Sequence, residues 1–146
     1  MCIRDSPESI PACVLADGIA AGMLLVSVDE NGPVGFALCR LQAKTLYLDQ
    51  LSVDPAHGRL GIGRSLIMHV LALAEEHKRS SVTLSTFREV PWNGPYYRKL
   101  GFREIPRKKM TDWMFEIEQT QAETLDVTQR YFMQRSLKRF ASVGLR

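Results

Sequence analysis

Cysteine and long apolar runs are both scarce in this chain, and their scarcity excludes several classes of protein. Only three cysteines occur among the 146 residues, and they are widely spaced, Cys2, Cys13 and Cys39. This spacing fits neither a disulfide framework nor a metal site. A membrane-spanning helix needs roughly 20 apolar residues, and a proline and an Asp-Gly pair interrupt the stretch Ile10–Val28. We therefore expect free thiols, no metal, no membrane segment and a cytoplasmic location.

A large charge of one sign is missing too. The formal net charge is +3, and the sequence pI is about 8.9. This mild excess suits an anionic ligand such as a nucleotide cofactor, but it argues against nucleic acid, whose binding proteins carry a clustered basic face. The short basic run Arg107–Lys109 is interpreted as the solvated start of a helix. Apolar content of 45% and charged content of 24% are ordinary for a globular domain.

The patterns that are present indicate helices and strands of one α+β domain. A helix ends within Pro7–Asp17, and three strands that form an antiparallel meander follow it, Met23–Val28, Val34–Leu41 and Leu46–Val53. Strict alternation in the third strand places two sets of side chains on opposite faces of the sheet. One set is Leu46, Leu48, Gln50 and Ser52, and the other is Tyr47, Asp49, Leu51 and Val53. This alternation predicts that Asp49 shares a face with Val53.

The second half of the chain adds a strand–helix–strand unit. Helix Arg64–Lys78 has an apolar stripe, and strand Val82–Ser85 follows it, which favours a right-handed crossover and a parallel strand pair. The remaining elements are a short helix, a strand beginning, a helix and a closing strand, Trp92–Leu100, Phe102–Ile105, Thr111–Glu123 and Arg130–Leu137. The expected fold is a layered α/β/α domain on a mixed sheet, a meander followed by a βαβ unit.

A glycine-containing loop, His57–Arg64, lies between the third strand and the first long helix. Glycines let successive backbone N–H groups converge, and the helix N-terminus adds a partial positive charge, so the loop suits phosphate. Arg59 and Arg64 flank it and can pair with phosphate oxygens. It matches neither a Walker A loop nor the dinucleotide fingerprint, which needs a third glycine where Leu66 stands. The alternative is a simple tight turn.

Two strings carry a specific resemblance. VDPAHGRLGIGRSL, Val53–Leu66, resembles motif A of the GNAT acyltransferases, and WNGPYYRKLGF, Trp92–Phe102, resembles that family's later Asn…Tyr…Leu-Gly-Phe motif. The resemblance covers Met23 to Phe102 and extends to Leu137. It implies a GNAT-like fold and transfer of an acetyl group from acetyl-CoA to an amine of a small molecule or peptide. Gly58 and Arg59 depart from the family pattern, which lowers the agreement in side chains but removes no amide.

The resemblance also implies residue roles. Leu51 and Val53 would offer backbone groups to the pantetheine arm, and Asn93 would contact it near the thiol. Tyr97 would be the general acid that protonates the departing thiolate, for which a phenol is suited because its pKa lies close to a thiol's; the alternative is a core aromatic. The pyrophosphate would be held by the loop amides, Arg59, Leu60, Gly61, Ile62, Gly63 and Arg64.

The general base is open among several residues. Asp49 is the first candidate and Glu89 the second; either can equally be a solvated surface carboxylate, and His57 is a third possibility. Cys39 lies on the middle strand of the meander, away from the motifs, so an acyl-cysteine route lacks support. We expect direct attack of the amine in a ternary complex.

The chain is interpreted as one acyl-CoA N-acyltransferase domain, residues 1–146, with a tail at 138–146. Met1–Ser6 fits no element and is interpreted as an artefact that replaces the family's first strand and helix. The first strand would then have an open edge, which favours pairing into a homodimer. Two other functions remain open: a catalytically silent acyl-CoA-binding module, and an acyltransferase for protein-linked or tRNA-linked amines.

Overall fold

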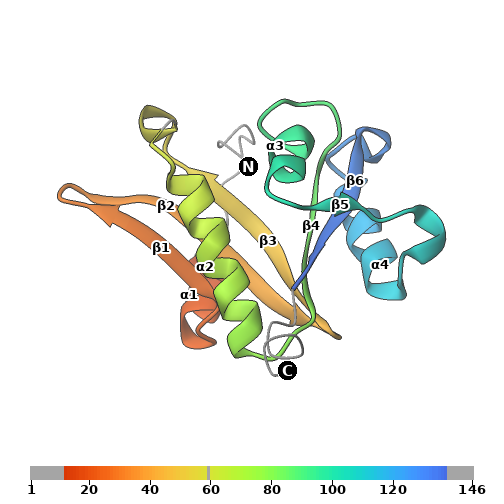
Figure 1. The fold of residues 1–146 in the computed structure, drawn as a ribbon, viewed down its shortest axis with the longest axis horizontal. Coiled ribbons are helices and arrows are strands. Elements are labelled where there is room, and N and C mark those ends of the chain that lie inside the picture. The colour runs from red at the N-terminus through yellow and green to blue at the C-terminus, as the bar shows by residue number, and fades with distance from the viewer. Residues whose placement is uncertain (1–11, 59, 138–146) are drawn as a thin grey trace, which may run out of the picture.

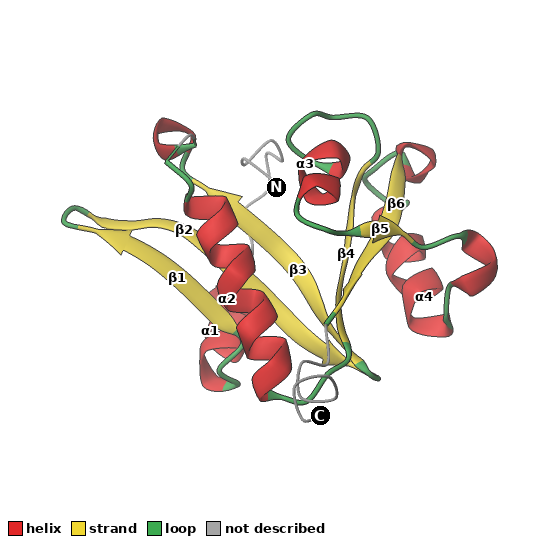
Figure 2. Cartoon of the chain, in the orientation of Figure 1, coloured by secondary structure: helices red, strands yellow, loops and turns green. Residues whose placement is uncertain are grey.

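The computed structural model describes residues 12–58 and 60–137. The helices are α1 (Ala12–Ala20), α2 (Ile62–Glu76), α3 (Gly94–Lys99) and α4 (Asp112–Gln121), with short 3₁₀ helices η1 (Pro55–His57), η2 (Arg107–Lys109) and η3 (Val127–Gln129). The strands are β1 (Leu24–Asp29), β2 (Gly32–Gln42), β3 (Thr45–Val53), β4 (Ser81–Phe87), β5 (Arg103–Glu104) and β6 (Arg130–Ser136) (Figures 1 and 2). The expectations for Met1–Ser6, Arg59 and the tail at 138–146 lie outside these residues.

The strands form one mixed sheet in the order β1-β2-β3-β4-β6-β5. The predicted meander is confirmed, because β1 pairs antiparallel with β2 and β2 pairs antiparallel with β3. The predicted parallel pair is β3 with β4, joined by the crossover helix α2. Strand β6 then inserts antiparallel between β4 and the two-residue strand β5. Element ends differ by a few residues from the sequence prediction: α2 begins at Ile62, and α3 begins at Gly94.

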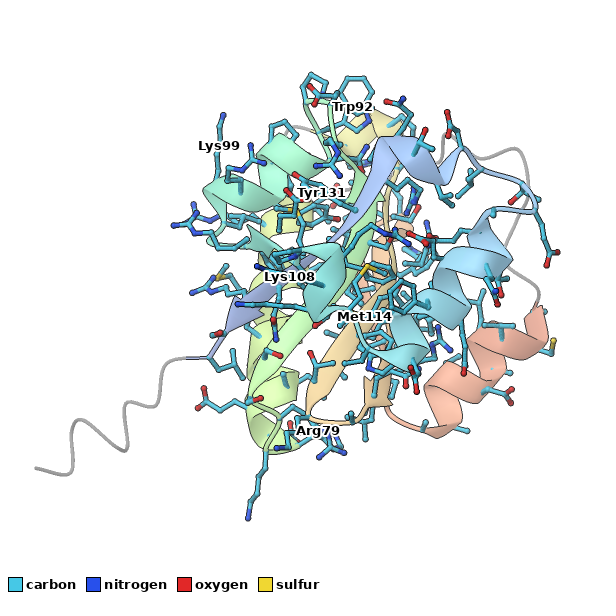
Figure 3. The ribbon with its side chains drawn as sticks, turned by 90° about the vertical axis from the view of Figure 1, so that its right-hand side faces the viewer. Arg79, Trp92, Lys99, Lys108, Met114 and Tyr131 are labelled. Carbon is cyan, nitrogen blue, oxygen red and sulfur yellow. The ribbon has the colours of Figure 1, made fainter. Side chains whose placement is uncertain are left out.

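Helices cover the two faces of the sheet in different pairs. Helices α2 and α3 lie on one face, here the α2 face, and α1 and α4 lie on the other, here the α4 face (Figure 3). The apolar stripe of α2 is buried against strands β1 to β4, as expected from its spacing, Leu66, Ile67, Val70, Leu71 and Ala74. A smaller cluster joins α4 to the opposite face, through Met114, Tyr47 and Phe132. No helix in the described ranges has the length and apolarity that crossing a membrane requires.

The predicted alternation along β3 is wrong, because a β-bulge interrupts the strand at Asp49. Leu38 pairs with Gln50 and Cys39 pairs with Leu48, so Asp49 has no partner on β2. One extra residue shifts the side-chain phase by one. Leu51 and Val53 therefore pack in the α2-face cluster, whereas Asp49 turns to the α4 face, where it meets Arg40.

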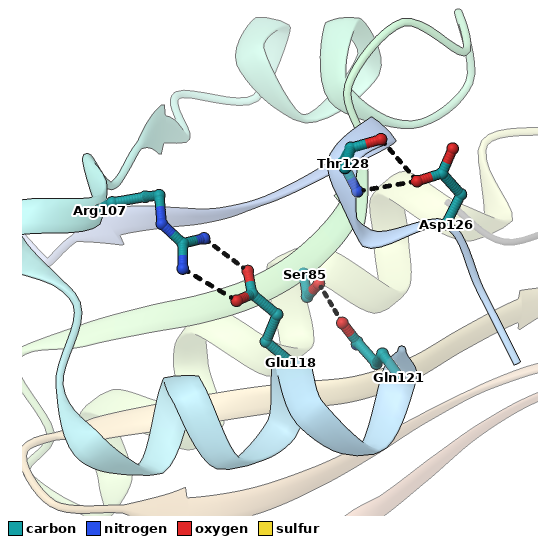
Figure 4. Close-up of polar contacts among 6 residues, drawn as sticks. All are labelled: Ser85, Arg107, Glu118, Gln121, Asp126 and Thr128. Atoms are coloured by element: carbon teal, nitrogen blue, oxygen red, sulfur yellow. Dashed lines mark hydrogen bonds and ion pairs between the residues drawn. The ribbon is translucent and has the colours of Figure 1, made fainter. Parts of the chain in front are cut away.

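Polar contacts hold the segment around α4 in place (Figure 4). Arg107 donates two hydrogen bonds to Glu118, at 2.9 and 3.1 Å, which links η2 to α4. Ser85 on β4 donates to Gln121 at the end of α4, at 3.3 Å. Asp126 caps η3 by accepting from the backbone N–H of Thr128 at 3.1 Å. These contacts fix α4 over the end of β4.

Candidate active site

The parallel pair at the centre of the sheet separates halfway along its length. Pairing of β3 with β4 ends at Leu48 and Leu84. Beyond that point the edge of β3 that faces β4 has no described strand partner from Asp49 to Val53, and Ser85–Phe87 of β4 pair only with β6. We call this region the β3–β4 split. Backbone groups of Leu51 and Val53 on that edge are open to an extended ligand, as a pantetheine arm requires.

The first turn of α2 lies beside the split. Gly61 is its N-cap, in the left-handed conformation with φ of 78°, and no side chain caps the helix. The amides of Gly61, Ile62, Gly63 and Arg64 make no hydrogen bond to another described residue. Free amides at a helix N-terminus are the groups that bind anions in many proteins. Gly35 lets this turn approach the sheet, since a Cβ there would meet Ile62 at 3.1 Å and the carbonyl of Ser52 at 3.0 Å.

Asn93 and α3 form the other side of the split. Asn93 is buried, with 4% exposure, and its side-chain oxygen accepts a hydrogen bond from Thr86 of β4 at 2.8 Å. Its carbonyl accepts from the amide of Tyr97 at 2.9 Å. The absence of a side chain at Gly94 allows this segment to pack closely on the end of β4, because a Cβ would come within 2.6 Å of the carbonyl oxygen of Arg88. Thr86 therefore fixes the orientation of the Asn93 amide.

Tyr97 sits on α3 with 4% of its surface exposed. Its ring packs edge-on against Phe102 and Tyr96, with centroids 5.7 and 5.5 Å apart. Both the catalytic and the core-aromatic interpretation of Tyr97 fit this packing, and its role stays a prediction. Neighbouring Tyr96 is half-buried, and burial raises its pKa while Arg64 partly offsets the shift.

Asp49 is the residue at which β3 leaves β4. Its carboxylate lies 3.4 Å from Nε of Arg40 on β2, and its side chain keeps 36% exposure. The pKa of Asp49 is raised above its ordinary value, mainly because partial burial disfavours the charged form, and Arg40 partly lowers it again. Burial, and to a lesser extent the same carboxylate, raise the pKa of Tyr47, whose ring stacks under Arg40. A carboxylate with a raised pKa is a stronger base than an ordinary aspartate.

The other two base candidates have different surroundings. Glu89 is exposed in the loop between β4 and α3. His57 lies between two carboxylates, with Nε2 3.2 Å from Asp29 and Nδ1 3.5 Å from Asp54. These contacts tie the loop before α2 to the β1–β2 turn, which supports the interpretation of His57 as a polar loop residue.

Sequence reasoning missed two positioning residues, Arg40 and Thr86. Arg40 stands opposite Tyr47 in the β2–β3 pairing, so its approach to Asp49 follows from the hairpin register. Thr86 could not be assigned, because its bond to Asn93 depends on how the intervening loop folds back. Within the described residues no group of three His, Cys, Asp or Glu side chains could hold a metal ion.

Comparison with known proteins agrees with this geometry. A family model described as an acetyltransferase (GNAT) domain matches residues 20–104, which include the split, the α2 turn and α3. A curated relative, the peptidyl-lysine N-acetyltransferase YjaB of Escherichia coli (strain K12), is 32% identical over 90 residues. That match takes in 61% of this chain and 55% of YjaB. The chain thus spans about half the length of this relative.

Solved structures share the fold. N-acetylglutamate synthase from Neisseria gonorrhoeae, complexed with coenzyme A and N-acetyl-glutamate, matches with a TM-score of 0.74 at 15% identity, over 90% of this chain and 29% of that one. Arabidopsis thaliana Naa50, in complex with the bisubstrate analogue CoA-Ac-MVNAL, matches with a TM-score of 0.67 at 20% identity, over 92% of this chain and 86% of that one. At these identities the likeness concerns the fold.

Proposed function

Since the chain belongs to the GNAT acetyltransferase family, we propose that it transfers the acetyl group of acetyl-CoA to a primary amine, with the side-chain amine of a peptide lysine as the first acceptor to test. The observation that carries the proposal is the β3–β4 split flanked by the amides of Gly61–Arg64, Asn93 and Tyr97. The lysine acceptor is suggested by the name of the YjaB relative. The cytoplasmic location and the homodimer expected from the sequence stay predictions.

In this proposal each group has a defined task. The amides of Gly61–Arg64 bind the CoA pyrophosphate, whereas the Leu60 amide, also expected from the sequence, donates to the carbonyl of His57 at 3.3 Å. The backbone of Leu51 and Val53 and the side-chain amide of Asn93 hold the pantetheine arm in the split. A ternary complex places the acceptor nitrogen against the thioester carbon, which is the main source of rate acceleration. Phosphate binding at the α2 turn needs no lysine, because the helix N-terminus supplies the positive end.

The chemical step combines a base, Asp49, with an acid, Tyr97. Asp49 accepts a proton from the acceptor ammonium, directly or through water, so that the neutral nitrogen attacks the carbonyl carbon. The new C–N bond forms as the C–S bond breaks, and the Tyr97 hydroxyl donates its proton to the departing sulfur. The acetylated nitrogen releases its second proton to solvent, and the proton held by Asp49 returns to the Tyr97 phenolate through solvent, so one proton is released per turnover. Glu89 is the alternative base.

Direct attack is favoured over an acyl-cysteine intermediate. Cys39 is 2% exposed in the α2-face cluster, and burial together with Asp49 raises its pKa to about 12. A thiol that keeps its proton at neutral pH is a poor nucleophile. Initial-rate plots should therefore intersect, as a ternary complex requires, whereas parallel lines would indicate a ping-pong route.

The test is thiol release from acetyl-CoA with a lysine-containing peptide, using Tyr97→Phe and the matched control Tyr96→Phe. Loss of a general acid should lower kcat by roughly 10²-fold or more in Tyr97→Phe, with CoA affinity retained, while Tyr96→Phe stays within about threefold. A protein that is stabilised by CoA but releases no thiol with any amine, and is indifferent to Tyr97→Phe, is the silent binding module instead. Turnover with protein or aminoacyl-tRNA acceptors alone would identify the macromolecular alternative.

A further inference from the structure

A basic cavity opens between α2, the end of α3 and the free end of β6. Its volume is about 1010 Å³, and five cationic side chains line it, Arg64, Lys99, Arg103, Lys109 and Arg135. Each comes from a different element, α2, α3, β5, η2 and β6 respectively. Figure 3 looks onto this edge of the sheet, with Lys99 at the end of α3 and Met114 marking the α4 side. Because the five side chains come from five elements, the positive charge here is not a local run of basic residues in the sequence.

The charge of this cavity is uncompensated. Glu104 is the one carboxylate that the described residues contribute to its lining, and it pairs with Arg88 at 3.1 Å. Among residues 12–58 and 60–137, none of the five cations forms an ion pair. Five like charges around one cavity repel one another and create a positive field that an anion relieves.

Two neighbouring arginines, unlike the five cavity cations, have side-chain partners among the described residues. Arg107 is neutralised by Glu118, and Arg98 donates to the hydroxyl of Tyr131 at 3.0 Å. Arg135, by comparison, is fixed in the cavity wall by a hydrogen bond from Nη1 to the carbonyl of Leu100 at 2.9 Å, an acceptor that does not neutralise its charge. Its guanidinium is thereby held ready for a second partner.

We propose that this cavity binds a ligand that carries several phosphate groups, at a site separate from the amides of Gly61–Arg64. Phosphate fits better than a single carboxylate, because several oxygens are needed to engage cations from five elements, and arginine pairs with phosphate oxygens bidentately. Among the described residues, Arg64 is the one cation that belongs both to the α2 turn and to the cavity lining. With the pyrophosphate of CoA assigned to the α2 turn, the ribose end of CoA has one phosphate left, so the ligand of the cavity is a separate polyphosphate compound.

The probe is inorganic tripolyphosphate, titrated into the whole chain by calorimetry at about 0.15 M salt, where distant surface charges are largely screened. We expect saturable binding that Lys99→Glu and Lys109→Glu each weaken by about tenfold or more. The matched control is Lys108→Glu, on the same 3₁₀ helix as Lys109 but outside the cavity lining, and its affinity should stay within about threefold. Absence of saturable binding, or an equal loss in the Lys108 variant, overturns the proposal.

Competition identifies the source of the phosphates. Tripolyphosphate displaced by CoA but not by dephospho-CoA means that the single ribose phosphate of CoA occupies the cavity, and it overturns the proposal of a separate polyphosphate ligand. No displacement by either means that a separate ligand occupies the cavity. Equal displacement by both means that the probe sits at the α2 turn, and it refutes a separate site. These measurements involve no acetyl transfer, so they stand or fall independently of the proposed activity.

Discussion

Asp49 combines three features that rarely meet in one surface carboxylate. It is the unpaired residue of a β-bulge, it follows the last residue of β3 that pairs with β4, and its pKa is raised because burial outweighs the attraction of Arg40. Bulges often re-aim side chains next to active sites. The bulge here turns the carboxylate away from the packed α2 face and toward the side where Arg40 lies.

Replacing Asp49 with asparagine should separate catalysis from stability. If the carboxylate is the base, kcat/KM with a lysine peptide falls by roughly 10²-fold, and the wild-type activity rises with pH through the raised pKa of Asp49. The matched control is Glu89→Gln, which should keep its rate. Loss of rate in the Glu89 variant, with Asp49→Asn fully active, assigns the base to Glu89 instead.

Thermal unfolding of Asp49→Asn provides the second measurement. A carboxyl group whose pKa is raised in the folded state contributes stability below its unfolded pKa and loses that contribution as pH rises through the folded pKa. The ordinary pKa of the aspartate is about 3.8, and the folded protein raises it. As pH increases from the ordinary pKa through the raised one, wild type should therefore lose stability relative to the asparagine variant. At neutral pH the variant should unfold at the same or a higher temperature. A marked drop in its melting temperature at pH 7 would show that the Arg40 pair is structural.

At the scale of the elements, the α2 turn depends on the backbone of Gly61. Its φ of 78° is left-handed, and a Cβ there would meet no atom of the described residues within 4 Å. The cost of a side chain is therefore conformational alone, about 1 kcal/mol for alanine. Gly61→Ala should weaken CoA binding and lower stability by that amount, whereas Gly61→Asn should cost less, because asparagine tolerates this region. Calorimetric titration with CoA checks the order; equal affinity in all three proteins would mean that the turn does not contact CoA.

Local patterns were sufficient to predict most elements of this fold. The apolar stripe of α2 and the short strand after it are both local in sequence, and they implied the parallel pair of β3 and β4 that the structure contains. The glycine at position 61 likewise marked the turn before α2. The bulge at Asp49 could not be predicted, because it reflects the pairing of β3 with β2, and both phases of the strand offer apolar residues to a core.

Contacts between distant segments were the other limit. The hydrogen bond from Thr86 to Asn93 depends on how the loops return to the sheet. The same holds for the cavity, which five separate elements form. The basic run Arg107–Lys109 illustrates this: interpreted as one solvated segment, it divides in the structure into Arg107, paired with Glu118, and Lys109, which lines the cavity. Each residue's role is set by its neighbours across the sheet edge.

Considered as a whole, the molecule has two unlike faces. The α2 face holds the larger core cluster together with Tyr97, and the α2 turn and α3 both lie on it. The α4 face holds a smaller cluster around Tyr47 and Phe132, and Asp49 opens toward it. If acetyl-CoA enters from the α2 face, the acceptor must approach from the α4 face, because the thioester needs access from both sides of the split.

Truncation of Trp113 tests this division. Its ring packs edge-on against Tyr47 and Phe132, with centroids 5.4 and 6.3 Å away, so Trp113→Ala should cost about 2 kcal/mol or more and loosen α4. We expect the KM for the amine to rise about fivefold or more while the affinity for CoA changes by less than about twofold, since ground-state binding is lost on one face only.

The control is Val70→Ala, at a fully buried residue of α2. This substitution costs a similar amount, about 2 kcal/mol, on the opposite face. It should affect CoA more than the amine. If both variants change both constants alike, the effect is general destabilisation, and the assignment of acceptor and cofactor to opposite faces is wrong.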